Sequence, residues 1–139
     1  NKAARDCMVR YAVHACTDVT GFGLLGHAFE MAQGSDTHLT LFPGEIDLIP
    51  EALELARDGI LPAGMYRNRH YAEAAVDPGS TELAVQDMLY DPQTSGGLLI
   101  AAAPEDADAL LRELRGAVPS AQRIGVVEAY NGGPRISLR

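Results

Sequence analysis

The sequence predicts an α+β fold in which helices pack against a mixed, largely antiparallel sheet. Segments with apolar residues at helical spacing are interleaved with short strand-like segments, but not in the strict order of a doubly wound fold. Two strand-like segments near the end are joined by Asn131-Gly132-Gly133, a sequence typical of a hairpin turn. Together these observations favour α+β over α/β.

Apolar stripes and end signals predict the helices. Gly34 is a common helix stop, and Pro50 and Pro104 are placed as first-turn residues. Ser80 or Thr81 is expected to cap a short helix. The predicted helices cover residues 2–15, 20–34, 50–58, 81–89 and 104–116.

Strands are indicated by alternation and by β-prone residues. Leu39 and Leu41 alternate with polar neighbours, and DPQTSGGLLIAA passes from a turn into a small-residue strand. RIGVVEAY and PRISLR are the two strands of the predicted hairpin. Residues 60–80 hold Pro and Gly pairs around YRNRHY and are predicted to be a long loop with little regular structure.

Composition narrows the class of protein. The chain has 139 residues, 47% of them apolar, which suits one compact domain. Lys and Arg number 11 against 19 Asp and Glu, for a formal charge of -8, so a nucleic-acid partner is not expected. No apolar run is long enough to cross a membrane and no signal region is recognised, which predicts a soluble, cytoplasmic chain. The start without Met, in a helix-like segment, suggests a piece of a longer protein.

The cysteines and two of the histidines are interpreted as structural. Cys7 and Cys16 lie nine positions apart on a predicted helix, hence on roughly opposite faces, so they are expected to be buried and reduced. His14 and His27 each lie on a predicted apolar helix without a second ligand at metal spacing, which favours core or boundary positions.

Three glycines, Gly21, Gly23 and Gly26, match the spacing of a dinucleotide-binding turn. That motif needs a preceding strand, and the helical period of residues 2–15 argues against one. A less specific interpretation remains, because glycines at a helix N-terminus leave backbone N–H groups open to phosphate oxygens. Thr20 adds a hydroxyl as a further possible donor.

Asp18 stands next to this glycine turn and would repel a phosphate unless a divalent cation lay between them. Mg²⁺ binds in this way, through one or two carboxylates and substrate phosphates. Asp18 is therefore a candidate metal ligand, with Thr20, Gly21 and Gly23 near the phosphates. The alternative is that Asp18 or Thr20 caps the following helix, and spacing alone favours this structural interpretation.

Weaker candidates lie further along the chain. Thr94, Ser95, Gly96 and Gly97 supply hydroxyls and bare amides beside a strand, although DPQTSGG taken alone is typical of a tight turn. Arg67 and Asn68, with the neighbouring Arg69, offer groups that can meet an anion, although exposed arginines are commonly solvated. No GxSxG, HExxH or GxxxxGK[ST] motif is present.

Three stretches carry a resemblance to a known family. ACTDVTGFGLLGHAFEMA, DPQTSGGLLIA and MYRNRHYA (residues 65–72) closely resemble the C-terminal domain of the selenophosphate synthetases, or selenide, water dikinases. These belong to the superfamily of aminoimidazole ribonucleotide synthetase, whose C-terminal domain has the α+β plan expected here. The resemblance spans nearly the whole chain and is weakest over residues 35–60 and 105–139.

The resemblance implies that residues 1–139 are the single C-terminal domain of a longer two-domain enzyme. The N-terminal domain would carry the catalytic Cys or selenocysteine, most contacts to ATP and the homodimer interface, so no catalytic residue is expected here. Asp18 would complete a Mg²⁺ site with N-terminal aspartates, and Thr20 and Gly21 would lie near the phosphates. Cys7 and Cys16 are left without a catalytic role.

The intact enzyme would convert ATP, selenide and water into selenophosphate, AMP and phosphate, and the isolated chain is expected to be inactive. Two alternatives stay open. One is a domain of another ATP-dependent synthetase of the superfamily, which would release ADP. The other is a noncatalytic phosphate- or partner-binding module whose glycine turn is purely structural.

Overall fold

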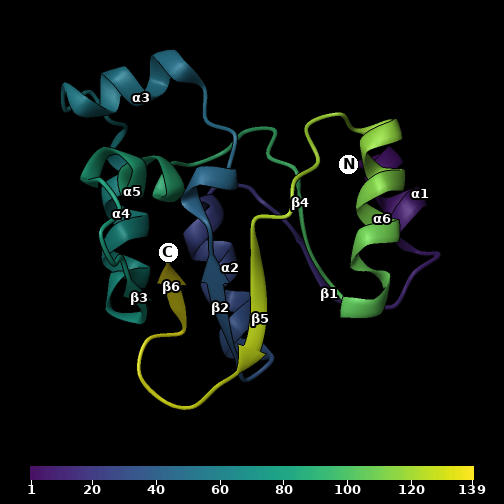
Figure 1. The fold of residues 1–139 in the computed structure, drawn as a ribbon. Helices are drawn as coiled ribbons and strands as arrows, with labels where there is room; N and C mark the ends of the chain where they lie inside the picture. The colour runs from purple at the N-terminus through teal and green to yellow at the C-terminus, as the bar shows by residue number, and fades with distance from the viewer.

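The computed structural model describes all residues, 1–139, and confirms an α+β fold with mixed sheets (Figure 1). None of its helices combines the length and the apolar character needed to cross a membrane. The helices are α1 (Lys2–Met8), α2 (Gly23–Gly34), α3 (Pro50–Arg57), α4 (Ala63–Ala72), α5 (Leu83–Tyr90) and α6 (Pro104–Ala117), with 3-10 turns at Pro43–Glu45 and Glu73–Ala75. The strands are β1 (Val13–Asp18), β2 (Thr37–Leu41), β3 (Val76–Asp77), β4 (Leu98–Ala102), β5 (Gly125–Ala129) and β6 (Ile136–Leu138).

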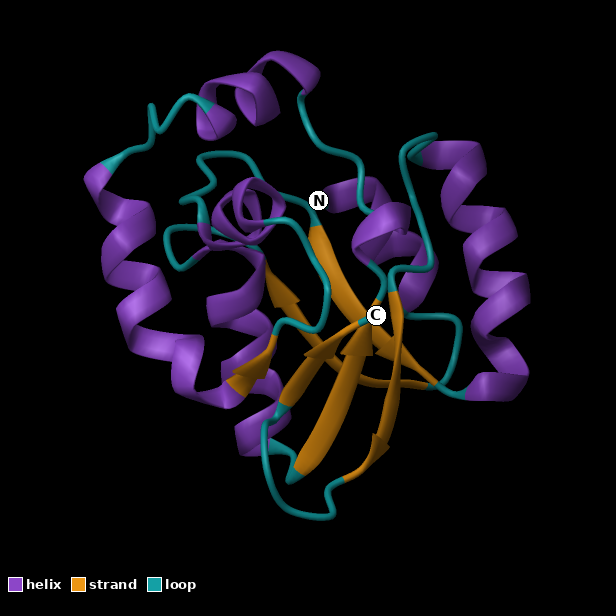
Figure 2. Ribbon diagram, turned by 60° about the vertical axis from the view of Figure 1, so that its left-hand side comes forward, coloured by secondary structure: helices purple, strands orange, loops and turns teal.

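The strands form two sheets (Figure 2). β1 and β4 pair antiparallel as a two-stranded ribbon. The other sheet has the order β3-β6-β2-β5, in which β5 is antiparallel to β2 while β6 is parallel to both β2 and β3. Figure 1 shows the ribbon running between the larger sheet and the pair of helices α1 and α6.

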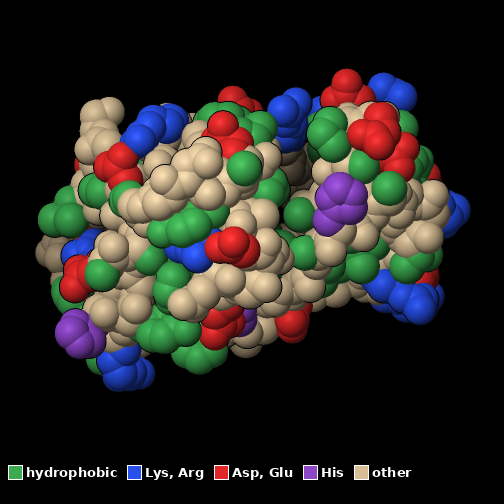
Figure 3. All heavy atoms as spheres, turned by 90° about the horizontal axis from the view of Figure 1, so that it is seen from below, with side chains coloured by type: hydrophobic (Ala, Val, Ile, Leu, Met, Phe, Trp, Pro, Cys, Tyr) green, Lys and Arg blue, Asp and Glu red, His purple; other side chains and the backbone are tan.

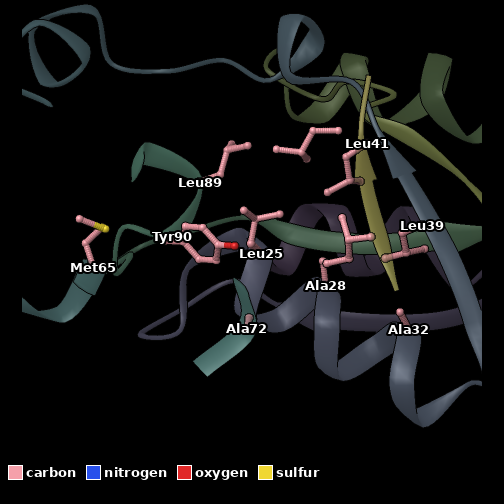
Figure 4. Packing of buried hydrophobic residues seen from close by; sticks show 11 residues of the cluster. Leu25, Ala28, Ala32, Leu39, Leu41, Met65, Ala72, Leu89 and Tyr90 are labelled. Carbon is pink, nitrogen blue, oxygen red and sulfur yellow. The ribbon is translucent and has the colours of Figure 1, made fainter. Parts of the chain in front are cut away.

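The larger core lies between α2 and the four-stranded sheet (Figure 4). Leu25, Ala28 and Ala32 follow the three- and four-residue steps of a helix and are fully buried, facing Leu39 and Leu41 of β2. α4 and α5 also pack against this core. α4 contributes Met65 and Ala72, α5 contributes Leu89 and Tyr90, and β6 contributes Ile136 and Leu138.

A smaller core fixes the β1–β4 ribbon against the two terminal helices. Cys7 of α1 packs with Leu110 and Leu114 of α6, and Val13 and Ile100 of the ribbon lie against them. The ribbon therefore packs against α1 and α6.

Over the face drawn in Figure 3, acidic and basic side chains are interspersed, without a large patch of one sign.

The first predicted helix is wrong in its second half. α1 ends at Met8, and residues 13–18 form β1, in which half-buried and exposed residues alternate. Apolar residues over 8–15 fit a helical stripe on paper, but the pairing of β1 with β4 satisfies their backbone groups instead. The expected burial of Cys16 and the expected core or boundary position of His14 are therefore wrong, since both side chains are exposed on a strand. Cys7 is buried as expected, and both thiols are free.

A strand, β1, therefore does precede the glycine turn, so the prediction that no strand lies there is wrong. A dinucleotide-binding site is still absent, because its motif requires a parallel β–α–β unit. Here β1 pairs antiparallel with β4, and α2 leads into β2 of the other sheet.

The predicted loop over residues 60–80 is also wrong, since α4 occupies residues 63–72. Pro62 stands just outside the helix, where a missing N–H costs nothing, and the Pro78-Gly79 pair follows it. Met65, Asn68 and Ala72 give α4 its buried stripe. The short helix α5 is confirmed, but its N-cap is Glu82 and no side chain caps it.

The predicted hairpin near the end does not form. β5 and β6 lie on opposite sides of β2, so the turn around Gly132 and Gly133 is a crossing loop. β2 lies between β5 and β6 because its Leu39 and Leu41 are buried in the core. This central position gives β2 a hydrogen-bonded partner strand on each edge.

Replacing Leu25 by Ala is expected to lower the free energy of unfolding by about 2–5 kcal/mol, because the side chain is fully buried in the larger core. The matched control is Leu55→Ala, at a side chain 46% exposed, which should cost far less. Urea denaturation followed by circular dichroism measures both. Equal losses would contradict the assignment of Leu25 to the core.

Candidate functional site

The two glycine-rich segments singled out in the sequence lie side by side in the fold. β1 and β4 pair with Asp18 opposite Leu98, so the residues after β1 meet the residues before β4. The N–H of Val19 donates to the carbonyl of Gly97 at 2.9 Å, and the N–H of Gln93 donates to the carbonyl of Thr20 at 3.0 Å. The strand pairing thus joins the turn at residues 19–23 to the segment at residues 91–97.

Two glycines permit this close approach. A Cβ on Gly96 would overlap the backbone carbonyl of Val19. Gly23 has a φ of 70°, and a Cβ there would lie 2.6 Å from the carbonyl carbon and oxygen of Tyr90. Both contacts are with backbone, which cannot swing aside, so any larger residue must displace one of the segments.

Backbone N–H groups remain unpaired in both segments. The amides of Thr20, Gly21 and Phe22 donate no hydrogen bond within the protein, and Gly21 and Phe22 are exposed. The same holds for the amides of residues 94–97, where the hydroxyls of Thr94 and Ser95 are also without a partner. Such runs of unpaired amides are suited to anionic oxygen ligands.

Asp18 is the last residue of β1 and is exposed. Its carboxylate takes part in no hydrogen bond or ion pair, and it borders an open hollow of about 380 Å³ that is also lined by Lys2 and Arg5. Both cations bind Asp6 instead. No group of three His, Cys, Asp or Glu side chains is placed to hold a metal ion. The chemistry of a free carboxylate fits one ligand position of a hard cation such as Mg²⁺.

The structure does not support the helix-cap alternative. Phe22 is the N-cap of α2, and no side chain caps this helix. The Thr20 hydroxyl instead forms a hydrogen bond with His27 Nε2 at 3.0 Å, and His27 Nδ1 lies 3.6 Å from Glu30. His27 is buried as expected, and its bond to Thr20 is an additional finding. Thr20 and His27 are seven residues apart, about two turns of the helix predicted over residues 20–34, and this spacing is the sequence signal for the contact.

Asn68 is buried and not available to an external anion. Its side-chain amide donates to the carbonyl of Gly21 at 2.8 Å and to the carbonyl of Tyr90 at 2.9 Å. Sequence reasoning missed this role because it treated residues 60–80 as a loop. The spacing of Met65, Asn68 and Ala72 on one helical face is the signal that indicates it.

The two arginines beside Asn68 differ from one another. Arg69 pairs with Asp87, which is buried on α5, and its guanidinium carbon lies 5.7 Å from the centre of the Tyr90 ring. Arg67 is exposed, and its Nη2 lies with the Pro92 ring against Gly64. Arg67 is therefore beside the segment at residues 91–97 and has no ion-pair partner, whereas Arg69 is part of the packing.

Cys16 shares the exposed face of β1 with Asp18. Partial burial, and then the negative charge of Asp18, raise the pKa of the Cys16 thiol above its usual range. A thiol held in its neutral form is a poor nucleophile. Burial also raises the pKa of the Asp91 carboxyl, at the start of the second segment.

The chain that carries these segments matches a known family. The family model described as "AIR synthase related protein, C-terminal domain" matches residues 1–135, and the chain belongs to this family.

Its relatives include enzymes named selenide, water dikinase. The chain is 47% identical to the enzyme of Clostridioides difficile over 116 residues, which are 83% of this chain and 33% of that protein. It is 46% identical to that of Treponema denticola over 114 residues, 82% of this chain and 32% of that protein. For Desulfitobacterium hafniense the identity is 43% over 134 residues, 96% of this chain and 39% of that protein. The chain thus spans about a third of the length of these relatives, and the resemblance seen in the motifs is confirmed.

Changing Gly96 to Ala is expected to lower the free energy of unfolding by about 1–3 kcal/mol, since the added methyl group would overlap the Val19 carbonyl. Gly97→Ala is the matched control, because a Cβ at Gly97 meets no atom within 4 Å. Thermal unfolding of both variants measures the difference. A Gly96 variant as stable as the Gly97 variant would show that the two segments are not in close contact.

Changing Asp18 to Asn is expected to lower the pKa of the Cys16 thiol by removing a neighbouring negative charge. The thiolate fraction at pH 8 then rises, and alkylation by iodoacetamide should become about two- to fivefold faster. Mass spectrometry of the modified peptide measures the rate, with buried Cys7 as the internal control. An unchanged Cys16 rate would mean that Asp18 does not act on this thiol.

Proposed function

We propose that this chain is the C-terminal domain of a longer, two-domain selenide, water dikinase. That enzyme would convert ATP, selenide and water into selenophosphate, AMP and phosphate. The proposal is supported by the high identity to enzymes of that name across most of the chain. The observation that carries it to particular residues is the unpaired carboxylate of Asp18 beside two segments of unpaired backbone amides.

Asp18 is proposed as one ligand of a Mg²⁺ ion. A carboxylate next to a phosphate site is repulsive unless a cation separates the charges, and Asp18 has no cation of its own chain bound to it. A single carboxylate binds Mg²⁺ weakly, because the ion gives up water reluctantly. The other ligands would come from acidic residues of the N-terminal domain and from the phosphates, whose developing charge the metal neutralises.

The glycine turn is proposed to contact the phosphates. The unpaired N–H groups of Thr20, Gly21 and Phe22 lie just before α2, where the helix dipole adds to their attraction for an anion. Gly23 has no free amide for this purpose, since its N–H donates to Thr20, and it serves by allowing the turn to pack on Tyr90. Residues 94–97 and Arg67 are proposed as secondary contacts that close over the same phosphates.

The remaining functions are assigned to the absent N-terminal domain: the nucleophile for selenium chemistry, most contacts to the nucleoside and the homodimer interface. The isolated chain is expected to show no turnover. The two cysteines of the chain are free, which suits a reducing cytoplasm.

Changing Asp18 to Asn in the full-length protein is expected to reduce selenophosphate formation by at least about a hundredfold, since even outer partners of a metal site contribute about 10- to 100-fold. Phosphorus NMR of reactions containing ATP, selenide and Mg²⁺ identifies the products. Wild-type protein should yield selenophosphate and AMP.

Asp47→Asn is the matched control, at an exposed carboxylate outside the site, and should leave the rate unchanged. Full activity of a folded Asp18→Asn variant would remove Asp18 from the metal site. Release of ADP in place of AMP by the wild-type protein would instead assign the chain to another synthetase of the superfamily. Wild-type protein that consumes no ATP with any phosphoryl acceptor would favour a noncatalytic binding module.

A further inference from the structure

We propose that Asn68 is a positioning residue that sets the direction of the Phe22 amide toward the phosphates of the nucleotide. The inference rests on the proposed function, because it assumes that the whole protein binds ATP at the glycine turn. Asn68 touches no ligand in this scheme and acts through the backbone of the turn.

Asn68 connects three parts of the fold with one side-chain nitrogen. It lies on α4, 7% exposed, and uses both hydrogens of its amide on main-chain carbonyls. One carbonyl is that of Gly21 in the glycine turn, and the other is that of Tyr90 at the end of α5. A buried donor whose two hydrogens are both bound fixes the direction of each acceptor.

The direction of the Gly21 carbonyl determines that of the next amide. In a trans peptide the C=O and N–H groups point in opposite directions across the peptide plane, and the chain has no cis peptide bond. Since the Gly21 carbonyl points inward to Asn68, the N–H of Phe22 must point away from it. That N–H donates to no acceptor in the protein, and Phe22 is 46% exposed.

The preceding peptide is fixed in the same way by different atoms. The Thr20 carbonyl accepts hydrogen bonds from the N–H groups of Gly23 and Gln93, so the N–H of Gly21 points away from these donors. Two successive amides are thereby left unpaired. The first is held by main-chain donors, those of Gly23 and Gln93, whereas the second is held by the side chain of Asn68.

Without Asn68 the Gly21–Phe22 peptide loses the partner that holds it. Gly21 has no side chain, and a Cβ built there would meet no atom within 4 Å. Glycine permits rotation of the adjoining peptide, so the Phe22 N–H would no longer be held toward a bound phosphate. A hydrogen bond to a charged oxygen would be lost or weakened. The affinity for ATP should then fall about tenfold or more.

The test uses full-length protein labelled with ¹⁵N-phenylalanine. This chain has three phenylalanines, and the Phe22 amide signal is assigned by its loss in Phe22→Tyr. On addition of ATP and Mg²⁺ to wild type, the Phe22 signal is expected to shift while those of Phe29 and Phe42 change little. In Asn68→Ala the dissociation constant for ATP should rise about tenfold or more, and the Phe22 shift should shrink.

Two further variants separate positioning from stability. Asn68→Asp keeps the shape of the side chain but presents oxygens to the Gly21 and Tyr90 carbonyls, and it should weaken ATP binding at least as much as Asn68→Ala. Leu110→Ala lowers stability through the smaller core and should leave ATP affinity and the Phe22 shift unchanged.

Wild-type affinity and an unchanged Phe22 shift in either folded Asn68 variant would overturn the inference while leaving the proposed function intact. A Phe22 signal that does not respond when wild type binds ATP would do the same. If wild-type protein binds no ATP at all, the proposed function is wrong and the inference falls with it.

Discussion

The antiparallel pairing of β1 with β4 is the constraint on which the candidate site depends. It places Asp18 opposite Leu98 and carries the chain on both sides into segments that touch through their backbones. The ribbon has only two strands, and such a pair is marginal alone. The smaller core, formed by Cys7, Leu110 and Leu114, therefore adds to the stability of this pairing.

The glycines of the site have different physical roles, although they look alike in the sequence. Gly23 and Gly96 are required by close backbone approach, whereas a Cβ at Gly21 or Gly97 meets no atom within 4 Å. The first pair holds the two segments together, and the second leaves the surrounding backbone accessible. Each segment thus combines a close backbone contact with an exposed surface, which suits a site that must keep its shape and still admit an anion.

The charges around the site are consistent with a shared metal. Unpaired amides attract phosphate oxygens, and the Asp18 carboxylate repels them. Lys2 and Arg5 are close to the hollow beside Asp18 but bind Asp6, so the carboxylate is not neutralised by its own chain. Partial burial, and then the negative charge of Asp18, raise the pKa of the Cys16 thiol. A cation brought in with the phosphates would offset the charge of Asp18.

The sequence by itself determined the fold class, the helices α3, α5 and α6, the strand β2 and the family, because these follow from local periodicity and from motifs of contiguous residues. It also singled out the two segments of the candidate site, since glycine-rich turns beside a carboxylate are visible in one dimension. Only the tertiary structure decided that these segments meet, that β1 is a strand, that α4 is a helix and that β2 separates β5 from β6. Those outcomes depend on hydrogen bonds between residues far apart in the chain, such as Asn68 with Gly21 and Val19 with Gly97, which no local pattern specifies.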